Sequence, residues 1–264
     1  MKTKILVFTF ITLLTYSCNK VPVTGRRQMN LMPESSLLAM SIEQYKQVLA
    51  TSKVVQSGAQ AEMVKRVGNN IAKSVEKFLA QNGYKNRLNQ FAWEFNLIDE
   101  NIVNAWCMPG GKVCFYTGIL PVTLDENGLA VVMGHEVAHA VARHGNERMS
   151  RGMAVSLGGA ALDVALAQKP DVTRNLFLQA YGIGAEVGVN LPFSRKNELE
   201  ADKMGLIFMK IAGYDPTKAP DFWKRMSQNG ANVPEFLSTH PSDETRIEEI
   251  KKYIQSKEFA KYTK

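Results

Sequence analysis

The sequence GHEVAHA at residues 134–140 lies inside an apolar run that extends from residue 129 to residue 142. On a helix, His135 and His139 would lie about 40° apart around the axis and ~6 Å apart along it. Both imidazoles could then bind one zinc ion at ~2.0–2.1 Å. Glu136 would lie beside the ion, where it could act on a water molecule. The His-Glu-x-x-His spacing therefore predicts a catalytic zinc site with one ion per chain.

A catalytic zinc usually has three protein ligands and a water molecule, so a third ligand must come from elsewhere in the chain. On a continuous helix, His144 would lie about 140° beyond His139. We therefore expect His144 to point away from the metal, as a polar residue at the helix end. Glu198 and Asp202 share one face of a later helix, whereas Glu200 points elsewhere. One of the first two could bind zinc while the other holds a ligand in place, although both would also suit a solvated helix start.

Together these motifs resemble the gluzincin family of HtpX-like and CAAX-prenyl-protease-like metallopeptidases. The resemblance is to the soluble bacterial envelope branch, similar to BepA and LoiP, and covers about residues 29–254. It implies that His135, His139 and Glu198 bind zinc, that Glu136 is the general base, and that Asp202 supports the ligands. Three further stretches carry the resemblance: NAWCMPGG at 104–111, YTGIL at 116–120 and THP at 239–241.

The resemblance also implies roles for residues outside the metal helix. His240 would either take the water position on zinc at rest or stabilise the oxyanion when substrate is bound, with Arg246 as a supporting residue. A loop histidine that caps a helix is the alternative for His240. The strand near Asn104 and Ala105 is implied as the edge to which an extended substrate adds as a further strand.

Periodicity predicts a mostly helical α+β fold with a small antiparallel sheet beside the His-Glu-x-x-His helix. The resemblance implies that this fold is a zincin-like catalytic domain. Alternation at residues 91–98 and short apolar runs at 102–108 and 113–116 predict the strands. A two-residue turn at Gly110 and Gly111 would pair Cys107 with Cys114, as a disulfide or as two packed thiols. Helical patterns cover residues 37–50, 58–80, 125–149, 196–212, 215–226 and 245–259.

The first 17 residues are predicted to be a signal peptide of the lipoprotein type. Lys2 and Lys4 precede an apolar stretch, residues 5–14, that is too short to span a membrane. The following Cys18 would be the lipidated first residue of the mature protein, although an ordinary secretory signal with an incidental cysteine is the alternative. We therefore expect a polar tether at residues 18–35, a zinc metallopeptidase domain at 36–264, and a lipid anchor in the bacterial outer membrane facing the periplasm.

Composition is that of an ordinary globular domain, with 45% hydrophobic and 22% charged residues in a chain of 264. The formal net charge of +7 is scattered, without a basic stripe, which argues against nucleic acid as a partner. The motifs predict a zinc endopeptidase. The resemblance, together with the leader, implies that it cleaves unfolded or damaged cell-envelope proteins as quality control. The alternatives are a zinc-plugged, chaperone-like binding module with little turnover and a zinc hydrolase of the cell wall.

Overall fold

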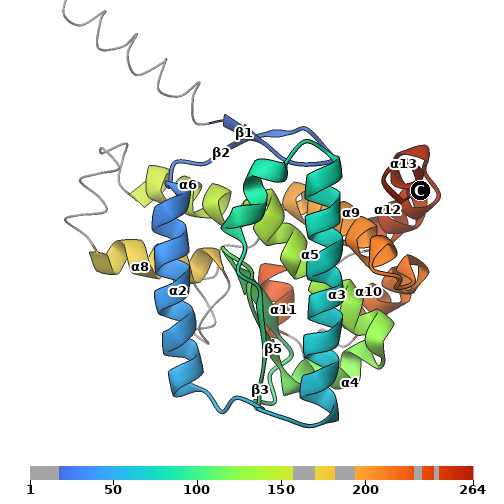
Figure 1. Ribbon diagram of the computed structural model, residues 1–264, viewed down its shortest axis with the longest axis horizontal. Coiled ribbons are helices and arrows are strands. Elements are labelled where there is room, and N and C mark those ends of the chain that lie inside the picture. The colour runs from blue at the N-terminus through green and yellow to red at the C-terminus, as the bar shows by residue number, and fades with distance from the viewer. Residues whose placement is uncertain (1–17, 157–169, 182–193, 229–233, 241–243, 264) are drawn as a thin grey trace, which may run out of the picture.

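The structure is a computed structural model that describes residues 18–156, 170–181, 194–228, 234–240 and 244–263. Helices make up most of it (Figure 1). Among these residues, no helix is both long and apolar enough to span a membrane. The helices are α2 (Glu34–Thr51), α3 (Ala59–Gln81), α4 (Leu120–Thr123), α5 (Glu126–Ala142), α6 (His144–Ser156), α8 (Pro170–Ala180), α9 (Arg195–Ile211), α10 (Ala219–Gln228), α11 (Pro234–Thr239), α12 (Glu244–Ile254) and α13 (Lys257–Thr263). The strands are β1 (Cys18–Lys20), β2 (Arg27–Met29), β3 (Glu94–Ile98), β4 (Ala105–Met108) and β5 (Lys112–Tyr116), and short 3-10 helices cover Lys85–Gln90, Thr117–Ile119 and Pro216–Lys218.

The central helix of the molecule is α5, which packs against α3, β4 and α9. Its residues are apolar on nearly every side, as expected for a helix that is buried all round. It comes closest to α9 where Gly134 faces Gly205. A Cβ atom on Gly134 would lie only 2.9 Å from the carbonyl oxygen of Gly205. Glycine at both positions therefore allows the two helices to approach at backbone distance.

A three-stranded sheet of order β3-β5-β4 lies beside α5 and confirms the predicted α+β class. The sheet is mixed rather than purely antiparallel, because β3 pairs with β5 in parallel while β4 pairs with β5 in antiparallel fashion. Residues 99–104 carry the chain from one edge of the sheet to the other, so β3 and β4 flank β5 instead of pairing with each other. Within this sheet β4 is an edge strand.

The turn between β4 and β5 differs from the prediction by one residue. Cys107 pairs with Val113 rather than with Cys114, because the loop contains residues 109–111 and its two glycines have φ of 79° and 78°. Side chains alternate between the faces of a sheet, so this shift places the two cysteines on opposite faces. Cys107 packs in the core cluster that contains α5, and Cys114 packs in the cluster that contains residues of α2. Both are buried free thiols.

The metal helix is shorter than predicted. It ends at Ala142, and Arg143 adopts a left-handed conformation with φ of 59° before α6 begins at His144. The backbone N–H of Arg143 donates to the carbonyl oxygens of His139 and Ala140. This break changes the direction of the chain, so positions after 142 do not follow the angular spacing of one continuous helix.

The N-terminal segment predicted as a tether, residues 18–35, is packed against the domain. Strands β1 and β2 form a hairpin in which Val21 is fully buried. Nε of Arg26, between the strands, donates to Glu200 Oε2 at 2.7 Å, and its Nη2 donates to Glu147 Oε2 at 2.8 Å. The expected tether is therefore structured up to the start of α2. The predicted signal peptide lies outside the described residues.

Substitution of Gly134 by alanine tests the close packing of α5 and α9. In an exposed helix this change would stabilise the fold by about 0.5–1 kcal/mol. Here the added methyl group must push the helices apart, so we expect a net loss of about 1–3 kcal/mol in the free energy of unfolding, measured in urea. Lys73→Ala, on an exposed face of α3, is the control and should change it by less than about 0.5 kcal/mol. A Gly134→Ala variant as stable as wild type would contradict the proposed packing constraint.

Candidate active site

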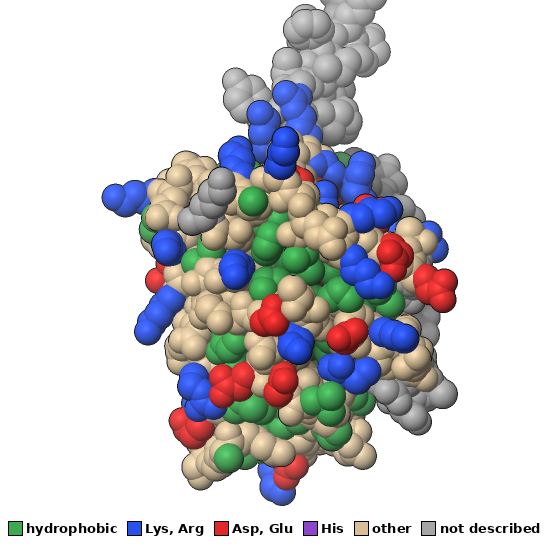
Figure 2. Space-filling model, turned by 90° about the vertical axis from the view of Figure 1, so that its right-hand side faces the viewer, with side chains coloured by type: hydrophobic (Ala, Val, Ile, Leu, Met, Phe, Trp, Pro, Cys, Tyr) green, Lys and Arg blue, Asp and Glu red, His purple; other side chains and the backbone are tan. Residues whose placement is uncertain are grey.

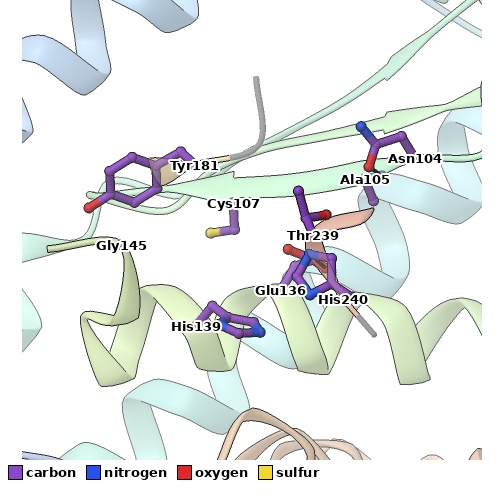
Figure 3. A pocket seen from close by; sticks show the side chains of 9 residues that line it. All are labelled: Asn104, Ala105, Cys107, Glu136, His139, Gly145, Tyr181, Thr239 and His240. Carbon is purple, nitrogen blue, oxygen red and sulfur yellow. Dashed lines mark hydrogen bonds and ion pairs between the residues drawn. The ribbon is translucent and has the colours of Figure 1, made fainter. Parts of the chain in front are cut away.

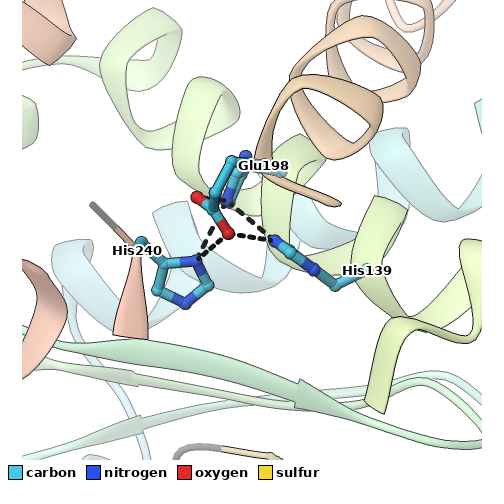
Figure 4. Close-up of side chains that lie close together, drawn as sticks. His139, Glu198 and His240 are labelled. Atoms are coloured by element: carbon cyan, nitrogen blue, oxygen red, sulfur yellow. Dashed lines mark hydrogen bonds and ion pairs between the residues drawn. The ribbon is translucent and has the colours of Figure 1, made fainter. Parts of the chain in front are cut away.

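Four buried residues bring one possible ligand atom each to the same point. They are His135, His139, Glu198 and His240, whose ligand atoms all lie within 4.8 Å of one another. Figure 4 shows the imidazoles of His139 and His240 directed at the carboxylate of Glu198. None of the four residues is more than 4% exposed. The two histidines and the glutamate predicted as ligands are therefore together, and His240 joins them.

Three separate elements supply these side chains. The spacing of four residues places two histidines on one face of α5, and α9 brings Glu198 from its first turn. Ser194 caps α9 by accepting a hydrogen bond from the backbone N–H of Asn197 at 3.2 Å, which fixes the start of that helix. His240 follows α11 and stacks on Phe236, with ring centroids 4.7 Å apart.

The distances between the ligand atoms fit a tetrahedral metal ion. Four ligands at ~2.0–2.1 Å from one ion lie about 3.3–3.4 Å from one another. Nε2 of His135 lies 3.0 Å from Nε2 of His139, 3.2 Å from Nδ1 of His240 and 3.4 Å from Oε2 of Glu198. Oε1 of Glu198 lies 3.3 Å from both Nε2 of His139 and Nδ1 of His240. Three nitrogens and a carboxylate form the donor set that zinc prefers.

Asp202 and Arg246 contact the ligand residues, in the positions that the family resemblance implies. Nδ1 of His135 donates to Asp202 Oδ1 at 2.9 Å, which leaves Nε2 of His135 directed at the metal position. Arg246 donates to both oxygens of Asp202, at 2.7 and 2.8 Å, and its Nη1 lies 2.9 Å from Glu198 Oε2. The guanidinium also lies over the ring of Trp223, with Cζ 3.6 Å from the ring centroid.

The electrostatics of the site favour a cation among the ligands. Burial disfavours ionisation of Glu198, but the electrostatic influence of the neighbouring His240 and Arg246 side chains outweighs it and holds the pKa of Glu198 well below its usual range. Burial also disfavours protonation of His135, yet its bonds to Asp202 and Glu198 raise its pKa to about 9. In contrast, burial raises the pKa of Glu136, which is not a member of the ligand cluster. A carboxyl group with a raised pKa is suited to accepting and returning a proton.

His144 is not among the clustered ligand residues, as predicted, but it is a buried partner of His139 rather than a polar residue at a helix end. It is fully buried, and its Nδ1 lies 3.0 Å from Nδ1 of His139. On the other side, Nε2 of His144 lies 3.3 Å from Oε2 of Glu200, which Arg26 also binds. If Nε2 of His139 binds a metal, its Nδ1–H donates to His144, whose Nε2–H donates to Glu200. The break at Arg143, which no periodicity argument would locate, makes this contact possible.

Beside the ligands lies a small cavity of about 10 Å³, lined by Asn104, Ala105, Cys107, Glu136, His139, Gly145, Tyr181, Thr239 and His240 (Figure 3). A cavity of this size holds about one water molecule. Oε1 of Glu136 lies 3.5 Å from Nε2 of His240 across it. The edge strand predicted to bind substrate therefore lines the same space as the predicted base. A peptide could enter this cavity only if His240 or the residues around it moved.

Comparison with known proteins identifies relatives along most of the chain. Residues 39–254 match the description of peptidase family M48. The chain is 32% identical over 243 residues to the mitochondrial metalloendopeptidase OMA1 of Schizosaccharomyces pombe, covering 89% of this chain and 66% of that protein. It is 37% identical over 179 residues to OMA1 of Arabidopsis thaliana, covering 67% of this chain and 34% of that protein. It is 29% identical over 161 residues to the beta-barrel assembly-enhancing protease of Escherichia coli, covering 59% of this chain and 33% of that protein. The chain thus spans about one third to two thirds of the length of these relatives.

These matches correct the predicted location. A lipid anchor in the bacterial outer membrane, facing the periplasm, is contradicted by relatives that are mitochondrial metalloendopeptidases from yeasts, a plant and human. The prediction depended on the leader, on Cys18 and on the resemblance to bacterial envelope members, and Thr15 stands where lipoprotein processing sites usually have leucine. A short basic and apolar leader therefore did not suffice to identify the compartment.

His144→Ala tests the support that His144 gives to His139. Loss of the buried partner should free the imidazole of His139 to rotate and weaken metal affinity about 10- to 100-fold. The measurement is competition for zinc with a chelator of known affinity. Met149→Leu, another buried change on α6, is the control and should bind zinc like wild type. Equal affinities for His144→Ala and wild type would show that this contact does not position the ligand.

Proposed function

The chain belongs to peptidase family M48, and we propose that it is a zinc-dependent endopeptidase that cleaves unfolded or damaged polypeptides. Its family and its relatives, which are named metalloendopeptidases or a protease, support this activity, and so do the motifs in its sequence. The observation that carries the proposal is the buried cluster of His135, His139 and Glu198 with Glu136 beside it.

Zinc is the metal that we propose for this metal-dependent family, because two imidazoles and a carboxylate are typical of a catalytic zinc site. His135, His139 and Glu198 would hold the ion. When bound, zinc supplies a Lewis acid that acidifies water and polarises a peptide carbonyl. Asp202 and Arg246 keep His135 and Glu198 in orientation, so the ligand set is arranged before the metal arrives.

Glu136 is the proposed general base and acid. It lies on α5 next to the first ligand and lines the cavity where substrate and water would meet. We propose that its carboxylate accepts a proton from the attacking water and then delivers that proton to the leaving amine. Burial raises the pKa of Glu136, which brings proton uptake and release closer to neutral pH.

His240 is proposed to restrain the enzyme at rest. Its Nδ1 lies where a fourth ligand would complete the tetrahedron, the position that catalysis requires for water or substrate. Among the described residues, the cavity of about 10 Å³ beside it has room for about one water molecule. Removal of the imidazole from this position would therefore open the site. The position of His240 at the fourth ligand site also favours the second candidate function, a zinc-plugged binding module with little turnover.

The substrate class is proposed from the edge strand β4. Asn104 and Ala105 line the cavity, so a peptide that paired with this edge would pass the base and the ligands. Main-chain pairing requires an extended segment and places little demand on its sequence. Unfolded or damaged proteins offer such segments, whereas stably folded proteins rarely do. A role in protein quality control follows from this preference.

Glu136→Gln tests the proposed chemistry. Glutamine has nearly the same shape but cannot accept the proton, so cleavage of casein should fall at least 100-fold. Zinc content, measured by mass spectrometry, should stay at the wild-type value because Glu136 is not a ligand. If this variant still cut casein at the wild-type rate, the role of Glu136 as base would be wrong. If wild type held zinc and never cut, the binding-module function would be favoured.

His240→Ala distinguishes between the two roles considered for His240, which are to plug the zinc site at rest and to stabilise the oxyanion. If His240 plugs the site, its removal should raise the initial rate of casein cleavage several-fold while zinc stays bound through the other three residues. A slower variant would assign His240 to oxyanion stabilisation instead. The chain offers a nearby control in Thr239→Val, which alters the cavity lining without removing a ligand atom.

The preference for unfolded chains predicts a difference between two forms of one substrate. Reduced and alkylated α-lactalbumin should be cut at least tenfold faster than the native, calcium-bound protein. The measurement is loss of the intact chain on a denaturing gel over time. Equal rates for both forms would rule out β4 pairing with extended segments as the basis of recognition.

A further inference from the structure

A second cavity, of about 290 Å³, lies away from the metal cluster, among the β1–β2 hairpin, the turn after α3 and the end of α5. Its lining is polar and basic. Lys20 comes from β1, Arg87 from the 3-10 helix after α3, and Arg143 from the break after α5. No carboxylate belongs to the lining as far as the structure describes the chain. The neighbouring surface is also basic, because Figure 2 shows Lys and Arg side chains gathered at this end of the molecule.

Arg87 is the least compensated charge in the cavity. Its side chain is 8% exposed, and Nη2 donates to the carbonyl oxygen of Val141 at 2.6 Å. Nε of Arg87 has no hydrogen-bond partner, and no ion pair to Arg87 is present in the described part of the chain. Burial, together with the positive charge of Arg143, lowers the pKa of Arg87 to about 10. A buried guanidinium without a counter-ion is costly, which suggests that an anion completes this site.

The other two cations leave the cavity with an excess of positive charge. Nε of Arg143 lies 3.1 Å from Oε2 of Glu34, and Nη2 of Arg143 donates to Gln90 at 3.1 Å. The ammonium group of Lys20 is exposed, with no ion pair among the described residues. Three cations against the single carboxylate of Glu34 give a local charge of about +2. A phosphomonoester carries about −1.5 to −2 near neutral pH, and the guanidinium fork suits its oxygens.

We propose that this cavity binds the phosphate group of a phosphorylated ligand. The volume exceeds that of a phosphate ion alone, so it admits a small group attached to the phosphate. Such a ligand would connect Lys20, Arg87 and Arg143, and thus the hairpin, the turn after α3 and the residue that precedes His144. Binding should therefore stabilise the corner that supports the metal helix. The phosphate could belong to a soluble phosphomonoester or to a lipid headgroup.

The test compares two kinds of probe on the full chain. Inorganic phosphate and glycerol 3-phosphate, titrated by calorimetry, represent the soluble source. Sedimentation with phosphatidylcholine vesicles, with and without phosphatidic acid, represents the lipid source. Lys20→Gln removes one exposed cation, and Arg87→Lys keeps the charge but loses the fork. Lys46→Gln, an exposed lysine on α2 outside the cavity, is the matched control.

We expect wild type and Lys46→Gln to bind alike, with a higher melting temperature when the probe is bound. Lys20→Gln should bind roughly tenfold more weakly, and Arg87→Lys more weakly still. This pattern with the soluble probes would assign a soluble ligand, and the same pattern only with phosphatidic acid vesicles would assign a lipid headgroup. The proposal is overturned if no probe binds, or if Lys20→Gln and Lys46→Gln bind equally.

Discussion

The arrangement of the site depends on the contact between two glycines, Gly134 on α5 and Gly205 on α9. Because neither residue has a Cβ atom, the helix with both histidines lies at backbone distance from the helix with Glu198 and Asp202. The first histidine directly follows Gly134, so the close approach and the metal ligands belong to one stretch of chain. A wider separation would move Glu198 away from His135 and His139 together.

The cluster concentrates polar groups inside an apolar core, which is costly unless each group has a partner. Most of these polar groups have hydrogen-bond or ion-pair partners, which lie on two sides of the cluster. On one side, Asp202 and Arg246 bind His135 and Glu198, and Trp223 covers the guanidinium. On the other side, His144 and Glu200 continue from His139 to Arg26 of the N-terminal hairpin. The remaining ligand atoms of the four clustered residues point at one another, and a cation between them would satisfy them.

The sequence predicted those parts of the site that follow from local spacing or from the family motifs. The pair on α5, the pair Glu198 and Asp202, and the approach of His240 all belong to this group. It did not predict the contact of His144, because that depends on a left-handed residue at Arg143, where arginine gives no turn signal. The sheet register was missed for a similar reason, because the sequence around Gly110 and Gly111 does not show whether the loop contains two or three residues. The packed hairpin at residues 18–35 depends on long-range ion pairs that periodicity cannot detect.

The central claim is that three histidines and one glutamate surround a single zinc ion. X-ray absorption at the zinc edge of the loaded, resting protein tests it most directly. The account predicts four nitrogen or oxygen neighbours at ~2.0–2.1 Å, with the outer-shell scattering of three imidazoles. A sulfur neighbour at ~2.3 Å, which would implicate a cysteine, or the absence of imidazole scattering would contradict it.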